Sequence, residues 1–175
     1  MPDKDIQQHD VPPHARNLRA GRWSESLVCY AVTKCVENRR PVLRSDAVAD
    51  IVVGCLDYLR NDGRIRLLAF CIMPDHAHVL FFLLGKHSLP DIMRSFGRFT
   101  ARKINELRGE GGPFWQEGFH DHRCRDETDI EELLTYIEHN PVRACLVQQA
   151  HDWPYSSANP RWKSSLDREW YRSVC

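Results

Sequence analysis

Apolar residues recur along the chain at two spacings, which together predict a mixed α+β protein. Helical spacing marks three segments, and we expect helices over residues 46–60, 91–107 and 126–141. Short runs rich in β-branched and aromatic residues predict strands over residues 27–32, 64–73, 76–84 and 118–125. The predicted order is β-α-β-β-α-β-α, and its first six elements match the split βαβ arrangement of ferredoxin-like folds.

The spacing between the middle two strands refines this fold prediction. Only Pro74 and Asp75 separate them, which favours an antiparallel pair. We therefore expect a ferredoxin-like α+β sandwich, with an antiparallel sheet that carries helices on one face, plus a C-terminal helix that carries Tyr136. The expected divisions are a flexible N-terminal arm (1–19), one domain (20–158) and a C-terminal tail (159–175).

Composition excludes several classes of protein. Hydrophobic residues make up 42% of the 175 residues, enough for a core, yet no apolar run is long enough to span a bilayer. The first residues lack the apolar centre of a signal peptide, so we expect a cytoplasmic protein without a membrane partner. Seven cysteines without a C-x-x-C pair argue against a disulfide framework or a zinc ribbon. The formal net charge is zero, so any nucleic-acid binding must depend on local basic surface.

Two histidine pairs are candidate metal ligands. His76 and His78 lie two residues apart on a predicted strand, so both imidazoles project from the same face of it and can supply half of a divalent-metal site. His120 and His122 form a second pair with the same spacing on the last predicted strand. Periodicity alone does not choose between the pairs, and either can equally consist of unrelated strand histidines.

The last predicted helix presents a second kind of chemistry. Its apolar stripe consists of Ile130, Leu133, Leu134 and Ile137. Tyr136 lies off this stripe, and Asn140 follows it by one helical turn on the same side. The same side of the helix thus presents a phenol, which can act as a nucleophile, and an amide oxygen, which can bind a metal. The alternative is an ordinary amphipathic tyrosine, with Asn140 ending the helix before Pro141.

Several ordered motifs resemble one family of DNA-processing enzymes. MPDHAHVLFF (73–82) resembles the metal-binding strand of HUH single-strand nucleases, and YIEHNPVRACLV (136–147) resembles the tyrosine helix of single-tyrosine transposases. The segments SLPDIMRSFGRFTAR, FWQEGFHDHRCRDE and WPYSS match in order as well. Over residues 20–158 the chain is similar to REP-associated tyrosine transposases, which are relatives of small insertion-sequence transposases.

This resemblance implies a specific activity. It implies that Tyr136 is the nucleophile and that His76, His78 and Asn140 bind Mg²⁺ or Mn²⁺. The implied reaction cleaves single-stranded DNA next to REP-like hairpins, leaving a 5′-phosphotyrosine link and a free 3′-OH for strand transfer. The implied setting is the bacterial nucleoid, and relatives include both monomers and homodimers, of which we favour the monomer.

DNA contacts are expected from basic side chains outside this site. Arg94, Arg98 and Arg102 recur every four residues and form a stripe on the second predicted helix, opposite an expected core face of Ile92, Phe96, Phe99 and Ile104. Arg123 adds a further basic residue. The alternative to a phosphate track is a solvated helix face. A competing function is a non-catalytic single-stranded nucleic-acid-binding module derived from a transposase.

Overall fold

The computed structural model describes residues 27–174, so the expected N-terminal arm lies outside the described residues. Eight helices and strands are ordered β1 (Cys29–Cys35), α1 (Asp46–Asn61), β2 (Ile65–Met73), β3 (His76–Leu83), α2 (Leu89–Arg108), β4 (His120–Arg123), α3 (Glu127–Arg143) and α4 (Arg168–Val174). Short 3-10 helices lie between them. None of the helices in the described part is long and apolar enough to cross a membrane.

The four strands form one sheet in the order β2-β3-β1-β4, and each neighbouring pair is antiparallel. The two central strands, β3 and β1, come from different halves of the βαβ pattern, as a ferredoxin-like fold requires. The predicted element order and fold class are therefore confirmed. Because the central strands lie side by side, residues from distant parts of the chain meet across β1.

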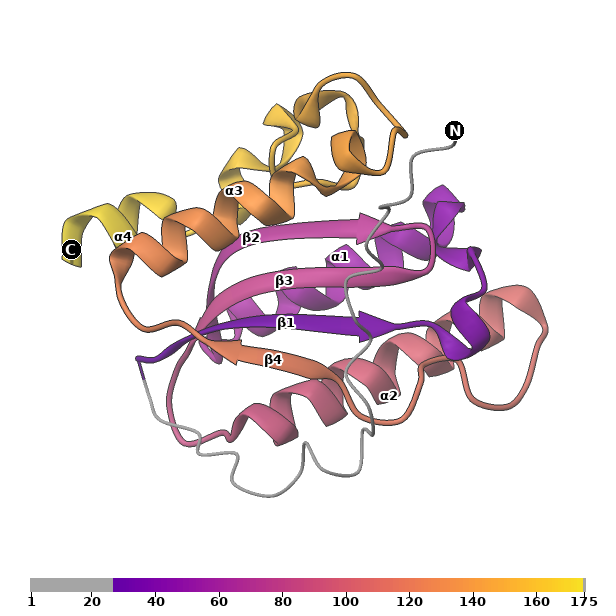
Figure 1. Ribbon diagram of the computed structural model, residues 1–175. Coiled ribbons are helices and arrows are strands. Elements are labelled where there is room, and N and C mark those ends of the chain that lie inside the picture. The colour runs from indigo at the N-terminus through magenta and orange to yellow at the C-terminus, as the bar shows by residue number, and fades with distance from the viewer. Residues whose placement is uncertain (1–26, 175) are drawn as a thin grey trace, which may run out of the picture.

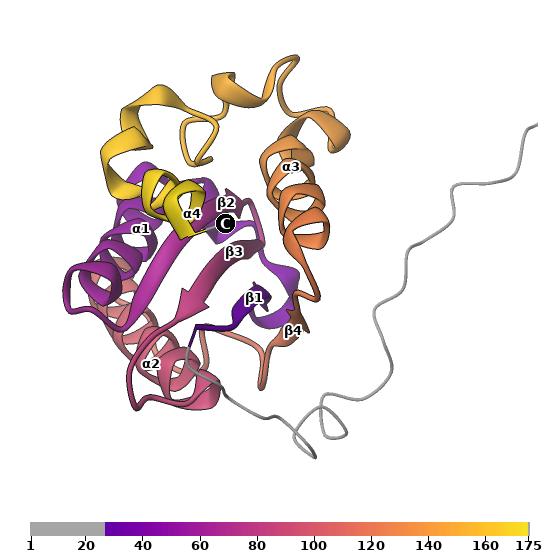
Figure 2. The ribbon, with the colours of Figure 1, turned by 90° about the vertical axis from the view of Figure 1, so that its left-hand side faces the viewer.

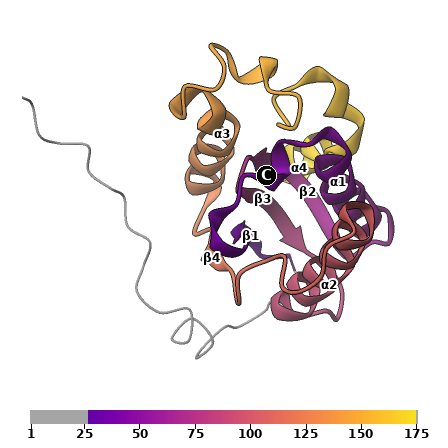
Figure 3. The same cartoon turned by 90° about the vertical axis from the view of Figure 1, so that its right-hand side faces the viewer.

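Helices cover both faces of the sheet, and each face has its own core. α1 and α2 lie on one side, while α3 lies on the other (Figures 1, 2 and 3). The α1/α2 side buries Val32, Leu56, Phe81 and Phe96, and the α3 side buries Cys71, Leu80, Ile130 and Ile137. Strand residues alternate between these two cores, because successive side chains point to opposite faces of a sheet.

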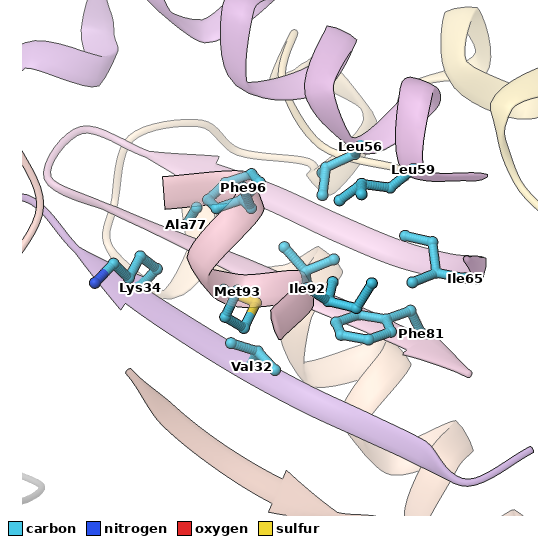
Figure 4. Close-up of a pocket in the computed structure, with 11 residues that line it drawn as sticks. Val32, Lys34, Leu56, Leu59, Ile65, Ala77, Phe81, Ile92, Met93 and Phe96 are labelled. Carbon is cyan, nitrogen blue, oxygen red and sulfur yellow. The ribbon is translucent and has the colours of Figure 1, made fainter. Parts of the chain in front are cut away.

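Lys34 is a buried cation at the edge of the α1/α2 core. Its aliphatic stem lies beside apolar side chains while its Nζ points away from them, as Figure 4 shows. The ammonium donates to the backbone carbonyls of Gln116 and Gly118. Lys34 therefore ties β1 to the segment that leads into β4, and burial lowers the pKa of this lysine to about 8.

Two predicted boundaries are wrong for reasons that concern the site. β1 continues to Cys35, beyond the predicted end at residue 32. α3 continues to Arg143 instead of ending at Pro141. Proline cannot donate to the carbonyl of Ile137, which leaves a helical hydrogen bond unmade. The Asn140 side chain compensates, because its Nδ2 donates to the carbonyls of Tyr136 (2.9 Å) and Ile137 (3.4 Å).

The C-terminal segment packs against the edge strand β2. The backbone N–H of Ile72 donates to the Tyr155 carbonyl (2.8 Å), and that of Ser157 donates to the Phe70 carbonyl (2.9 Å). Farther on, Asp167 is buried and its carboxylate accepts from the N–H of Leu67 (2.9 Å). The expected tail is thus an integral layer over β2, with α4 as its last element.

Candidate active site on the sheet face beneath α3

The two histidines of β3 face each other on the side of the sheet that α3 covers. Ala77 between them points into the opposite core, which confirms the alternation expected from the sequence. The Nε2 atoms of His76 and His78 lie 3.0 Å apart, and their rings are 4.6 Å apart between centroids. Two ring nitrogens therefore converge on one point.

The other ring nitrogen of each histidine has a partner that sets its orientation. His76 Nδ1 lies 2.6 Å from Asp75 Oδ1, and a carboxylate can only accept, so this nitrogen carries the proton. His78 Nδ1 lies 2.8 Å from the Thr33 hydroxyl, which can either donate or accept. Arg39 Nε in turn holds Asp75 at 3.0 Å. These contacts direct both Nε2 atoms inward.

Burial favours the neutral form of both rings. It lowers the pKa of His78 to about 3, and the neighbouring His76 adds to this effect. Burial also lowers the pKa of His76, although Asp75 opposes that shift. Neutral imidazole is the form that binds a metal, so at neutral pH both rings are ready to act as ligands.

Tyr136 reaches this pair from α3 within the same chain. Its ring lies 6.1 Å from the His78 ring between centroids, and its side chain is 41% exposed. The guanidinium of Arg143, seven residues later on the same helix, lies 4.8 Å from the centre of the Tyr136 ring. A cation over the ring face is attracted to the ring and helps to hold it in place. The structure thus brings together His76, His78 and Tyr136, three of the four residues expected at the catalytic and metal site.

Asn140, the fourth, lies one turn after Tyr136 as expected. Its amide nitrogen is occupied by the helix backbone, which leaves its Oδ1 as the group able to bind a metal. Its role as a ligand stays a prediction.

A hollow opens beside Tyr136 between α3 and the strands β1 and β4. Its lining includes Thr33, His78, His120, His122 and Tyr136. His122 Nε2 lies 2.9 Å from Asp129 Oδ2, which ties this ring to the first turn of α3. The second histidine pair is therefore next to the first, instead of forming a separate site elsewhere.

The donor set of the first pair fits a divalent cation. Within residues 27–174, no group of three or more His, Cys, Asp or Glu side chains gathers closely enough to hold a metal. His76 and His78 would therefore be completed by oxygen ligands, such as an amide, water or a phosphate. Thr33 suits this arrangement, because its hydroxyl can accept from His78 Nδ1 when Nε2 is needed as a ligand.

The expected basic stripe lies on the other side of the sheet from Tyr136. Arg94, Arg98 and Arg102 line a shallow hollow on α2, together with Phe99. Arg94 pairs with Asp91 (2.7 Å) and Arg102 with Glu106 (3.8 Å). The strand register also places Arg123 opposite Tyr30, on the α2 side of the sheet. These four residues thus form part of a different surface from the tyrosine site.

The expected core position of Phe99 is wrong, since its side chain is 42% exposed. The buried stripe of α2 instead passes through Thr100, which accepts from Trp115 Nε1 and donates to the Phe96 carbonyl.

Sequence reasoning missed Thr33, Asp75 and Arg143. Asp75 directly precedes the histidine pair, and Arg143 follows Tyr136 by seven residues, so spacing could have suggested both. Thr33 lay beyond the predicted end of β1, and its contact with His78 depends on the register between two strands.

Comparisons with known proteins identify the family of this chain. The chain matches the family described as IS200-like transposases over residues 24–140. It is 34% identical over 110 residues to a protein of Haemophilus influenzae described as a REP-associated tyrosine transposase. It is 28% identical over 99 residues to the REP-associated tyrosine transposase of Escherichia coli. Each match covers 57% of this chain, and the chain spans 62% and 58% of the two relatives' lengths.

A solved structure shares the fold. It is a REP-associated tyrosine transposase bound to a REP hairpin, with a TM-score of 0.61 and 23% identity, and the match covers 78% of this chain and 79% of that one. The family match extends over both the histidine strand and the tyrosine helix, from β1 to Asn140. The chain therefore belongs to the IS200-like transposase family.

Proposed function

We propose that this protein is a metal-dependent single-stranded DNA endonuclease and strand transferase that uses Tyr136 as its nucleophile. The observation that carries the proposal is that the Tyr136 ring lies 6.1 Å from the His78 ring between centroids, while His78 Nε2 lies 3.0 Å from His76 Nε2, all within one chain. A phenol beside two neutral imidazoles suits attack on a phosphodiester whose charge a cation offsets.

The reaction balances without an external energy source. The Tyr136 oxygen attacks phosphorus and forms an O–P bond, while the bond from phosphorus to the 3′ oxygen breaks. The phenol proton passes to solvent, and the released 3′ oxygen takes a proton from water. His76 and His78 would hold Mg²⁺ or Mn²⁺, with Asn140 as the third protein ligand, and the ion would neutralise charge on the phosphate oxygens. The phosphotyrosine link keeps the bond energy, so a 3′-OH can later reverse the step.

The proposed substrate is single-stranded DNA that carries a REP-like hairpin. Support comes from family membership and from the hairpin bound to the relative of known structure. The proposed active unit is the monomer, because Tyr136 reaches His78 within one chain and needs no exchange of α3. Light scattering with and without DNA would measure this directly, and a dimer that loses activity on dilution would contradict it.

A covalent adduct is the test of this function. We expect a hairpin-containing single-stranded oligonucleotide and Mn²⁺ to give a protein–DNA adduct that resists denaturant. Tyr136→Phe should lose the adduct while keeping the ring contacts, and Tyr58→Phe, which changes an exposed tyrosine on α1, is the matched control. A chain that shifts the DNA in a gel but never forms the adduct would instead be the non-catalytic binding module.

A further inference from the structure

His120, which lines the hollow beside Tyr136, has a buried polar atom that the proposed reaction does not use. Within residues 27–174, the Nδ1 atom of His120 is buried and has no hydrogen-bond partner. The side chain as a whole is only partly buried, and it lines the hollow together with Thr33, His78 and Tyr136. A buried polar atom without a partner costs free energy. We therefore ask which of the two ring nitrogens, Nδ1 or Nε2, carries the proton.

Strand register places His120 in a row with the proposed metal site. Thr33 on β1 is opposite His78 on β3 and also opposite His120 on β4. Residues directly opposite each other in antiparallel strands project from the same face of the sheet. His78, Thr33 and His120 therefore lie side by side across three strands, beneath α3 and its tyrosine.

The surroundings of the two ring nitrogens select a tautomer. A proton on Nδ1 would be a buried donor without an acceptor, whereas an unprotonated Nδ1 leaves only an unused lone pair. A neutral imidazole carries one proton, so here it resides on Nε2. His120 is thus a hydrogen-bond donor on the part of its ring that is left to face the hollow.

The same argument separates His120 from a general base. To take the phenol proton, the ring would need a free lone pair toward the hollow, and that lone pair is on the buried Nδ1. His122 differs, since its Nε2 is engaged by Asp129. In a neutral His122 the proton therefore resides on Nε2 and Nδ1 can only accept, whereas a neutral His120 offers a donor toward the hollow.

We propose that His120 is a catalytic hydrogen-bond donor, whose Nε2–H binds a non-bridging oxygen of the phosphate that Tyr136 attacks. This rests on the proposed function and adds a residue to it. The donor transfers no proton, and it stabilises charge that grows on the phosphate oxygen as the new O–P bond forms. A fixed donor of this type contributes about 10²- to 10³-fold to rate.

Amide substitutions test the position of the donor. The amide nitrogen of Gln is as many bonds from Cα as histidine Nε2, while that of Asn matches Nδ1. We expect His120→Gln to stay within about tenfold of the unaltered rate of adduct formation at saturating DNA and Mn²⁺. His120→Asn and His120→Ala should be slower by about 10²- to 10³-fold. Equal rates in all three variants, or a glutamine variant as slow as alanine, would overturn the proposal.

Two further readouts distinguish a donor from a base and from a metal ligand. The pH profile of His120→Gln should keep the shape of the unaltered profile, because no titrating base has been removed. Affinity for Mn²⁺ in the absence of DNA should stay unchanged in His120→Ala. Loss of one limb of the pH profile would identify His120 as a general base. Weakened Mn²⁺ binding would identify it as a metal ligand. Either result would overturn its assignment as a hydrogen-bond donor.

The tautomer can be measured without any reaction. Long-range ¹H–¹⁵N spectra of the metal-free protein, assigned with His120→Gln, should show Nε2 protonated and Nδ1 bare. A proton on Nδ1 overturns the donor assignment even if the enzyme is active. Absence of an adduct with the unaltered chain overturns the proposed function as a whole, whereas an adduct that forms equally fast in His120→Ala overturns only the role of His120.

Discussion

At the residue scale, the side chains that contact His76 Nδ1 and His78 Nδ1 set the orientation of these two candidate ligands. Asp75 fixes the tautomer of His76, and the Thr33 hydroxyl adapts to whichever tautomer His78 needs. Such partners orient the lone pairs that face the metal. Their loss should therefore weaken binding without changing the ligands themselves.

Replacing Thr33 with valine tests this dependence. Valine keeps the β-branched shape but removes the hydroxyl, so His78 Nδ1 loses its partner. We expect Thr33→Val to bind Mn²⁺ about 10- to 100-fold more weakly by titration calorimetry. Thr33→Ser keeps a hydroxyl and should bind within a few-fold of the unaltered protein. Equal affinity in all three would show that the hydroxyl has no part in metal binding.

Lys34 gives the molecule a pH-dependent contribution to stability. Its pKa is about 8 in the folded chain, below the ordinary value of 10.5. Between these two pH values the unfolded chain binds more protons, so stability rises with pH. Compared with Lys34→Met, the free energy of unfolding of the unaltered protein should increase by about 2 kcal/mol between pH 7 and pH 10. Denaturant titrations at both pH values measure the difference, and a constant or falling gap would contradict the assignment.

At the element scale, the hydrophobic periodicity predicted the helices and strands correctly. It could not predict the hydrogen bonds that side chains make to the backbone or the register between strands. The spacing of Ile130, Leu133 and Ile137 predicts α3, but the rule that proline ends helices predicts the wrong end. Only the structure shows that the Asn140 amide replaces the missing donor at Pro141. Likewise, the alternation around Ala77 orients both histidines, yet nothing in the β1 sequence alone identifies Thr33 as their neighbour.

Asn140 combines two roles that substitution can separate. Asparagine donates to the helix backbone and offers an oxygen to a metal, whereas aspartate offers only oxygens. We expect Asn140→Asp and Asn140→Ala each to lower the free energy of unfolding by about 1 kcal/mol through loss of the donor. Only Asn140→Ala should also weaken Mn²⁺ binding. Thermal unfolding measures the stability of both variants, and Mn²⁺ titration measures their affinity for the metal. If Asn140→Asp binds Mn²⁺ as poorly as Asn140→Ala, Asn140 is not a metal ligand.

At the scale of the whole molecule, the C-terminal segment stabilises the sheet by covering its edge. The Asp167 carboxylate accepts from the N–H of Leu67 and pairs with Arg60 at 3.0 Å. An uncovered edge strand can pair with other chains, so this cover also protects against association. The sequence predicts a C-terminal tail over residues 159–175, and its spacing does not reveal the buried carboxylate of Asp167 that anchors it.

Removing the Asp167 carboxylate should release this cover. Asp167→Ala leaves the Leu67 N–H and the Arg60 guanidinium without their acceptor, and we expect a loss of about 3 kcal/mol in the free energy of unfolding. Asp152→Ala, an exposed position, should change stability by less than about 0.5 kcal/mol. Denaturant unfolding compares the two, and light scattering should detect self-association only in the Asp167 variant. Matching stabilities would show that the segment is held by its other contacts alone.

The basic stripe on α2 and the tyrosine site lie on opposite sides of the sheet, so we expect them to have separable tasks in the proposed reaction. A DNA molecule that touches both must pass around the sheet, so arginines on α2 can strengthen binding without entering the chemistry. Arg98→Gln should therefore raise the Kd for a hairpin oligonucleotide and reduce the slope of log K against log salt by about one phosphate contact. Adduct formation at saturating DNA should keep its rate, because Tyr136 and the histidines are unchanged.

Lys163→Gln, on the C-terminal segment, serves as the charge-matched control. If Arg98→Gln instead slowed the saturated reaction while the salt slope stayed constant, the stripe would act on catalysis through the sheet, and the division of tasks between the two faces would be wrong.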